Sequence, residues 1–240
     1  MRTNVVSEIT NVKEMKEMVR FLANRPIEHM QGLGMIYGYW ALGKTFFPRK
    51  AAQKYGWIYY QLDANETPKS FITKLYDHIY FGVNGTVNEL PVSGSANKLL
   101  GECLDMLQTD PQTIIIDEID YAINKRVILE TIKTIVDKSF SEIIMIGMDN
   151  SKQKLLNKAP YIHSRVCYWV EAKPLSVKDV TTVVNDLCEV KLDEKLIKHL
   201  HGISRGRLRE LIKQLHVIES VALPAKMSQL SYDKYMGNTE

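Results

Sequence analysis

The chain has 240 residues, of which 45% are hydrophobic and 25% are charged, a balance typical of a globular protein with a sizeable core. No apolar run approaches the ~20 residues that a membrane-spanning helix needs, and the first twenty residues lack the apolar region of a signal peptide. The formal net charge of +3 is too small to indicate nucleic-acid binding by itself. We therefore expect a protein that does not associate with membranes.

The chain begins with a helix candidate at residues 11–24, whose apolar side chains recur at helical spacing. After it, strand and helix candidates alternate. Strands are predicted at residues 35–37, 57–62, 113–116, 142–146 and 166–170. Helices are predicted at about residues 44–54, 68–79, 96–107 and 125–138. This alternation predicts an α/β fold with a parallel sheet, helices on both faces and ligands at the carboxyl ends of the strands.

A phosphate-binding loop lies between the first strand and the following helix. The segment fits the pattern G-x-x-x-x-G-K-[ST] with Gly38, Tyr39, Trp40, Ala41, Leu42, Gly43, Lys44 and Thr45. In such loops the backbone N–H groups at a helix N-terminus hold phosphate oxygens. Lys44 is expected to reach the β- and γ-phosphates, and the Thr45 hydroxyl to ligate Mg²⁺. The sequence therefore predicts ATP and Mg²⁺ as cofactors.

An acidic pair ends the third strand candidate. The apolar run at residues 113–116 suits a buried parallel strand, and Asp117 and Glu118 follow it directly. Asp117 is expected to hold the magnesium ion through water, and Glu118 to orient and deprotonate an attacking water. An ordinary acidic strand end is the alternative for the pair alone, but the loop upstream in the expected order disfavours it.

Two further positions extend this nucleotide site. The strand at residues 142–146 is followed by Asp149 and Asn150, either of which could position the attacking water. Arg165 precedes the last strand, where an arginine can stabilise charge that develops on the γ-phosphate.

The remaining segments are a long loop, a helical region and a tail. Residues 81–97 are rich in Gly, Ser and Asn and predict a long loop, which in a compact domain is usually functional or mobile. Beyond Pro174, three helices are expected at about residues 176–189, 193–201 and 207–222, with Ser176 and Asp193 as N-caps. Arg209, at the start of the third, could reach the nucleotide. The expected domains are an N-terminal helical segment (1–30), a nucleotide-binding core (31–173), a helical lid (174–226) and a polar, loosely ordered tail (227–240).

Cysteines and basic residues add two expectations. Cys103, Cys167 and Cys188 are scattered in a way that matches neither a disulfide framework nor a metal site, which favours a reducing cytoplasm. The excess of positive charge lies in the C-terminal part, where Arg205 to Lys213 form a basic cluster that could face phosphates. A solvated helix face explains this cluster equally well.

With these elements in this order, the chain resembles the AAA+ ATPases, whose fold is a five-stranded parallel sheet followed by a helical lid. The resemblance implies that Arg165 is an arginine finger acting on a neighbouring subunit, hence a homo-oligomeric ring or filament, and that Arg209 is the lid's sensor arginine. Within that superfamily, residues 145–149, 163–166 and 206–211 resemble the DNA-transposition ATPases, namely the B protein of phage Mu and the target-selecting ATPases of CRISPR-associated transposons. A bacterial, phage or mobile-element origin would follow.

The finer resemblance implies a partner and a DNA surface. The partners would be double-stranded DNA and a transposase or other recombination protein. Loops at residues 65–69 and 85–98 would face the DNA, with Thr67, Lys69 and Lys98 as candidate phosphate contacts. A solvated lysine is an equally good explanation of Lys69. Such contacts give position without sequence information.

Two departures from the family pattern stand out. Glycine is usual where Ala41 stands, and small residues or proline are usual at Tyr39 and Trp40. These aromatic side chains could pack against the lid or weaken nucleotide binding. The other departure is the short segment before the sheet, which leaves DNA contact to the ATPase core.

The leading hypothesis, called the transposition hypothesis below, is an ATP-dependent ATPase that binds DNA without sequence specificity, oligomerises on target DNA and recruits or activates a transposase. Three alternatives to it remain open. The first is a helicase loader or replication-initiation ATPase that acts mainly through protein partners. The second is a small-molecule kinase that shares only the loop, which the acidic pair, Arg165 and the lid disfavour. The third is a nucleotide-binding switch without turnover.

Overall fold

The computed structural model describes residues 1–3, 5–88 and 92–237. By the density of its contacts the chain divides into two compact units. The sheet unit comprises Met15–Gly38 and Lys44–Glu171. The C-terminal unit comprises Met1–Glu14, Tyr39–Gly43 and Ala172–Glu240. The phosphate-binding loop therefore clusters mainly with the C-terminal unit, although the strand before it and the helix after it belong to the sheet unit.

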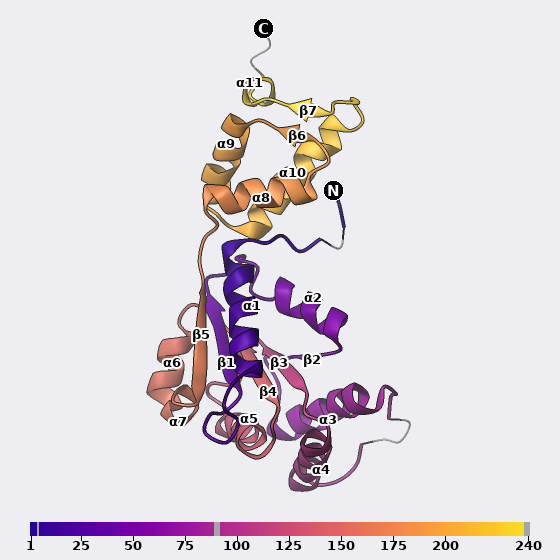
Figure 1. Ribbon diagram of the computed structural model, residues 1–240, viewed down its shortest axis with the longest axis vertical. Coiled ribbons are helices and arrows are strands. Elements are labelled where there is room, and N and C mark those ends of the chain that lie inside the picture. The colour runs from indigo at the N-terminus through magenta and orange to yellow at the C-terminus, as the bar shows by residue number, and fades with distance from the viewer. Residues whose placement is uncertain (4, 89–91, 238–240) are drawn as a thin grey trace. The chain divides into compact units, whose positions relative to one another are not determined.

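Five strands form the parallel sheet of the sheet unit, in the order β2-β3-β4-β1-β5 (Figure 1). They are β1 (Leu33–Gly38), β2 (Ile58–Gln61), β3 (Thr113–Asp117), β4 (Glu142–Ile146) and β5 (Val166–Ala172). In the parallel register, Ile143 of β4 lies opposite both Ile114 of β3 and Leu33 of β1. The predicted α/β fold with a five-stranded parallel sheet is confirmed.

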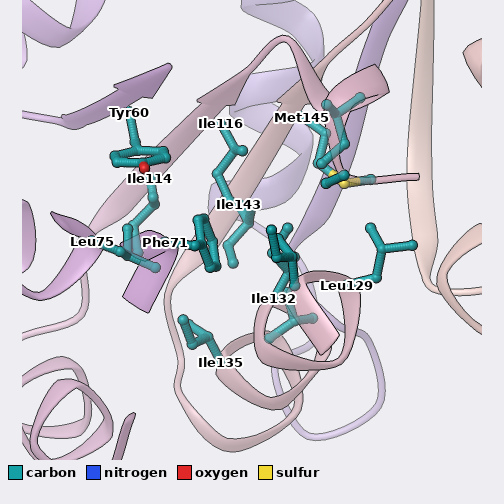
Figure 2. Packing of buried hydrophobic residues seen from close by; sticks show 14 of the residues in the cluster. Tyr60, Phe71, Leu75, Ile114, Ile116, Leu129, Ile132, Ile135, Ile143 and Met145 are labelled. Carbon is teal, nitrogen blue, oxygen red and sulfur yellow. The ribbon is translucent and has the colours of Figure 1, made fainter. Parts of the chain in front are cut away.

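Helices cover both faces of this sheet. In chain order they are α1 (Thr10–Ala23), α2 (Phe46–Tyr55), α3 (Pro68–Asn84), α4 (Ala96–Thr109), the 3-10 turn η1 (Ile119–Tyr121), α5 (Arg126–Lys138), α6 (Ser151–Lys158) and α7 (Pro160–His163). The main core lies between one face of the sheet and α3, α4 and α5, where Phe71 and Ile132 meet Ile114 and Ile143 (Figure 2). On the other face, α1 approaches so closely that a side chain at Gly34 would collide with Met18 and Leu22.

The alternation of the strands determines which face each site residue occupies. Ile114 and Ile116 of β3 belong to the core under α3, α4 and α5. Successive side chains of a strand point to opposite faces. Ile115 and Asp117 therefore point to the other face, on which α1 packs against Gly34.

The predicted long loop at residues 81–97 is wrong at both ends. α3 continues to Asn84 and stops at Gly85, whose φ of 70° is the left-handed conformation that glycine adopts at helix ends. α4 begins at Ala96, because the Ser95 side chain accepts a hydrogen bond from the backbone of Lys98. Residues 89–91 of the predicted loop lie outside the described residues. α6 and α7 were not predicted, because these polar helices bury little beyond Leu155 and Ile162.

The C-terminal unit contains more than the three expected helices. Its elements are α8 (Val177–Leu187), β6 (Lys191–Leu192), α9 (Glu194–Ser204), α10 (Leu208–Ala222), β7 (Gln229–Leu230) and α11 (Tyr232–Tyr235). Ser176 and Asp193 are N-caps, as predicted. The expectation of a loosely ordered tail is wrong for residues 229–235, since β7 pairs in parallel with β6 and the Tyr232 N–H donates to Asp193.

Residues 1–3 and 5–9 also belong to the C-terminal unit, and these described residues form no helix. The terminal amino group of Met1 pairs with Glu189 at 2.8 Å and with the buried Glu219 at 2.5 Å. α1 begins where Thr10 donates to Asp179. Among the described residues, no helix combines the length and the apolar character that crossing a membrane requires.

Candidate functional site

The phosphate-binding loop has the predicted strand–loop–helix setting. β1 ends at Gly38, α2 begins at Phe46, and residues 39–45 connect them. Gly38 and Gly43 have φ angles of 147° and 86°, conformations that favour glycine. Ala41 has a φ of 65°, which costs a non-glycine residue about 1–2 kcal/mol. The loop therefore keeps its turns even where alanine replaces the usual glycine.

Three contacts within the C-terminal unit hold the middle of this loop. The Ala41 carbonyl accepts a hydrogen bond from the backbone N–H of Arg209, at the start of α10, over 3.2 Å. The Leu42 carbonyl accepts one from the Asn11 side chain over 3.4 Å. The Arg207 guanidinium lies 3.9 Å from the centre of the Trp40 ring. The backbone of Arg209 thus contacts the loop, and Arg207 packs on Trp40, one of the two unusual aromatic residues. The expected contact of the Arg209 side chain with the nucleotide stays a prediction.

Lys44 is buried at the end of the loop. Its side chain is 9% exposed, and its ammonium group donates to the Gly38 carbonyl over 2.7 Å. Burial lowers the pKa of Lys44, and nearby carboxylates oppose this shift. These carboxylates are Glu118, Asp117, Asp120 and Asp149, in order of decreasing effect. A buried cation of this kind can bind the phosphates of a nucleotide, which would compete with these carboxylates for the Lys44 ammonium group.

The Asp117 carboxylate is fixed by two donors. Asp117 is only 2% exposed. Its Oδ1 accepts from the Glu118 N–H over 2.8 Å, and its Oδ2 accepts from the Tyr59 hydroxyl over 2.6 Å. Thr45 precedes α2 and makes no capping hydrogen bond through its hydroxyl. A carboxylate and a hydroxyl are hard oxygen donors that fit Mg²⁺, which usually takes few protein ligands beside substrate phosphates and water.

Glu118 has the properties of a general base. Its φ of 58° is left-handed, a strained backbone that recurs at functional sites. Burial raises the pKa of Glu118, and the charges of Asp117 and Asp120 add to this shift while Lys44 opposes it. A carboxylate with a raised pKa accepts a proton more readily near neutral pH.

Asp120 is a site residue that the sequence reasoning missed. Its Oδ2 accepts from the Met148 N–H over 2.7 Å and from the Ser151 hydroxyl over 2.8 Å. It therefore joins the turn after β3 to the turn after β4, where Asp149 acts on Lys44. Its position two residues after Glu118 was the available signal. Asn150 precedes α6 and is exposed. No described contact joins its amide side chain to the acidic residues of this site.

Arg165 lies apart from this cluster. It precedes β5, at the amino ends of the parallel strands, whereas Gly38 and Asp117 lie at the carboxyl ends. The guanidinium forms a bidentate pair with Asp137 of α5, at 2.8 and 3.0 Å, and donates to the Tyr161 carbonyl. Its expected role as a finger across an interface stays a prediction.

The predicted DNA contacts lie on two helix starts. Thr67 caps α3 by accepting from the Ser70 N–H, and Lys69 occupies the first turn of that helix. Lys69 donates to the Gly94 carbonyl, and the Lys98 stem lies close to the same glycine. Lys98 is on α4 and not on a loop, which corrects the expectation. The structure thus brings Lys69 and Lys98 together on one exposed surface.

The described cysteines are all unpaired, and the described residues contain no cluster of three or more His, Cys, Asp or Glu side chains that could hold a metal ion. The two neighbouring histidines have other contacts. His201 Nε2 forms a hydrogen bond with the Leu175 carbonyl, and the His199 ring packs on the rings of Tyr232 and Tyr235.

Comparisons with solved structures identify the fold. The chain is similar to the ORC2 protein of Aeropyrum pernix, solved in ADPNP–ADP complexes, with a TM-score of 0.68, 16% identity and coverage of 97% of this chain and 68% of that one. Cdc6p of Pyrobaculum aerophilum is similar with a TM-score of 0.67 and 16% identity, over 95% of this chain and 66% of that one. The ORC1 protein of Aeropyrum pernix, solved in complex with DNA, is similar with a TM-score of 0.61 and 15% identity, over 98% of this chain and 65% of that one. At these identities the likeness establishes the fold.

A protein-family match covers the nucleotide site itself. No curated protein matches the sequence. Residues 35–167 match the family described as AAA, the ATPase family associated with various cellular activities. This range spans more than half of the chain and includes Lys44, Asp117, Glu118 and Arg165. The chain therefore belongs to the AAA family of ATPases.

Proposed function

We propose that the chain is a Mg²⁺-dependent ATPase whose nucleotide state controls its binding to duplex DNA and to a protein partner, as in a replication-initiation or helicase-loading ATPase. The observation that carries the enzymatic part is the buried Lys44 ammonium among the carboxylates of Asp117, Glu118, Asp120 and Asp149. This arrangement supplies a cation for phosphates, a ligand for a divalent ion and a base.

The residues have separate roles in hydrolysis. The loop N–H groups and Lys44 would hold the phosphates, while Thr45 and Asp117 would hold the metal ion. Mg²⁺, when bound, neutralises charge on the β- and γ-phosphates. Glu118 accepts a proton from the attacking water as the oxygen of that water bonds to the γ-phosphorus. At the same time the bond between the γ-phosphorus and the ADP oxygen breaks. Asp149 or Asn150 orients the water, and Arg209 is the proposed sensor arginine for the nucleotide.

Binding to DNA rests on different evidence. The similar ORC1 protein was solved in complex with DNA. In this chain Lys69 and Lys98 converge beside Gly94, although the first already donates to the Gly94 carbonyl and the second pairs with Glu102 at 3.6 Å. These contacts use part of the donor capacity of each ammonium group, which has three N–H bonds. We propose phosphate contacts here and assembly of several copies on the duplex.

The transposition hypothesis is retained only as a second function. It rests on the sequence segments at residues 145–149, 163–166 and 206–211, and the comparisons add no support for a transposase partner. The similar ORC and Cdc6 structures favour the replication-initiation alternative. A purified transposase or a replicative helicase, each tested for ATP-dependent binding to this chain, would separate the two partners.

Two variants test the enzymatic proposal. Lys44→Ala removes the cation that faces the phosphates, so ATP binding is expected to be lost. Glu118→Gln keeps the shape of the side chain but removes the base, so ATP should bind without being hydrolysed. Calorimetry with ATP and a phosphate-release assay measure the two steps. Undiminished ATP affinity in the first variant would contradict the loop assignment, and wild-type turnover in the second would show that another group activates the water.

Wild-type protein that binds ATP without releasing phosphate, even on duplex DNA, would instead indicate the nucleotide switch without turnover. Phosphate transferred to a small molecule in place of water would indicate the kinase alternative.

A further inference from the structure

Tyr59 contacts the carboxylate of Asp117, the proposed magnesium ligand, and the proposed mechanism gives this contact no role. Its hydroxyl donates to Asp117 Oδ2 over 2.6 Å. Tyr59 stands on β2, an edge strand of the sheet, and Asp117 ends the neighbouring strand β3. In the register of the two strands Tyr59 lies opposite Ile115. Asp117 is therefore its diagonal neighbour on the same face, within reach of a long side chain.

Tyr59 donates its hydrogen bond to a carboxylate that is shielded from water. A buried carboxylate needs hydrogen-bond donors in place of water. Asp117 is 2% exposed, and among the described residues the Glu118 N–H and the Tyr59 hydroxyl donate to its two oxygens.

The Tyr59 ring also contacts α2, the helix that directly follows Thr45, the other proposed magnesium ligand. The Arg49 guanidinium lies 5.8 Å from the centre of the Tyr59 ring. Arg49 stands one turn after Thr45 and its N–H donates to the Thr45 carbonyl. Tyr59 thus lies between the helix that follows Thr45 and the strand that ends in Asp117.

We infer that Tyr59 is a positioning residue of the magnesium site, whose hydroxyl holds the Asp117 carboxylate in the orientation that receives the metal. This inference rests on the proposed function, because the metal is expected only with a bound nucleotide. Groups that orient a metal ligand from outside the coordination sphere typically change metal affinity by about 10–100-fold when they are removed.

The test is Tyr59→Phe, which removes one oxygen atom and keeps the ring. Binding of a fluorescent, slowly hydrolysed ATP analogue is measured against Mg²⁺ concentration and again in EDTA. We expect the half-saturating Mg²⁺ concentration to rise about 10–100-fold. The affinity in EDTA should stay at the wild-type value, because the loop and Lys44 are untouched. Melting temperatures confirm that each variant is folded.

Tyr60→Phe is the matched control. Tyr60 is the next residue of the same strand, and its hydroxyl also donates to a buried carboxylate, Glu66, over 2.8 Å. It points to the opposite face and packs on Phe71. The control loses an equivalent hydrogen bond away from the nucleotide, so its Mg²⁺ dependence should equal that of the wild type.

Three outcomes would overturn the inference, and they are distinguishable. Unchanged Mg²⁺ dependence in Tyr59→Phe would show that the hydroxyl does not position Asp117. An equal rise in both variants would show a general effect on the sheet. Wild-type protein whose nucleotide affinity ignores Mg²⁺ would overturn the proposed function together with the inference.

Discussion

The guanidinium of Arg165 is held by Asp137 in this structure, whereas its expected role places it at the nucleotide of a neighbouring copy. Arg165 and Asp137 are both about one-quarter exposed, and Arg165 also donates to the Tyr161 carbonyl. Solvent-accessible ion pairs contribute about 1 kcal/mol or less, and the bidentate geometry of this pair places it near the upper end of that range. At the residue scale, we therefore expect that assembly of several copies can release Arg165 from Asp137.

Arg165→Ala is expected to lower ATP hydrolysis by up to ~10³–10⁵, the range for lost arginine fingers, with a much smaller loss of ATP affinity. Mixing this variant with Lys44→Ala protein should restore part of the activity, because mixed assemblies contain interfaces with an intact loop and an intact finger. Steady-state phosphate release over a range of mixing ratios is the measurement.

Asp137→Asn is the control for the structural role of this pair. It breaks the ion pair but leaves Arg165 in place, so hydrolysis should be retained. Equal losses in Arg165→Ala and Asp137→Asn would mean that the pair only stabilises the fold. Absence of rescue in verified mixed assemblies would argue against action across an interface.

At the scale of elements, helix starts in this chain are specified by short side chains. Thr67, Ser95, Ser176, Asp193 and Ser231 each accept a hydrogen bond from a backbone N–H in the first turn of the following helix. α8 adds a reciprocal bond, because Asp179 accepts from the Ser176 N–H. The same carboxylate accepts two bonds from Thr10, so it also fixes the start of α1.

Asp179→Asn is expected to lower the free energy of unfolding by about 1–3 kcal/mol at pH 7, because a buried acceptor of several hydrogen bonds becomes an amide. Burial by itself raises the pKa of Asp179, but hydrogen bonds from Ser176 and Thr10 outweigh it and leave the pKa below its usual value. The stabilisation is thus complete above the unfolded pKa of about 4 and is lost as the pH falls through the folded pKa.

Urea denaturation at pH 7 and at pH 3 measures this difference. The difference in the free energy of unfolding between the wild type and Asp179→Asn should be smaller at pH 3 than at pH 7. Asp186→Asn, on the same helix, should have a small effect at both pH values, and a gap for Asp179→Asn that is independent of pH would contradict the role of its charge.

At the scale of the whole molecule, positive charge is not concentrated enough to predict DNA binding from the net value of +3. The structure nevertheless joins Lys69 and Lys98, which are 29 positions apart in the sequence, around Gly94. Contacts with phosphates release counterions, so DNA affinity should fall steeply with salt.

Replacing Lys69 and Lys98 together by alanine should weaken ATP-dependent binding to all duplex sequences alike and reduce the salt slope by about one unit per lost contact. Fluorescence anisotropy with two unrelated duplexes over a salt series measures both effects. The double variant Lys178→Ala and Lys195→Ala, which removes the same charge from exposed positions of the C-terminal unit, should bind like the wild type. Unaltered binding in the first double variant would point to the cluster of Arg205 to Lys213 instead.

The sequence alone determined the features that are local or periodic. The glycines and Lys44 of the loop, the acids after β3 and the N-caps depend on a few neighbouring residues, and the alternation of apolar runs specified the parallel sheet. Element ends and weakly apolar elements were harder to predict. α3 continued to Asn84, and α6, α7, β7 and α11 were missed, because they bury few side chains and carry little hydrophobic pattern.

Only the tertiary structure decided which distant residues meet. Tyr59 reaches Asp117 because the register of β2 and β3 makes them diagonal neighbours, and Asp120 joins two turns because β3 and β4 are adjacent in the sheet. The pairing of Arg165 with Asp137 likewise depends on where α5 ends beside β5. No local pattern encodes these contacts, since each depends on strand order and register, which are set by the packing of the whole core.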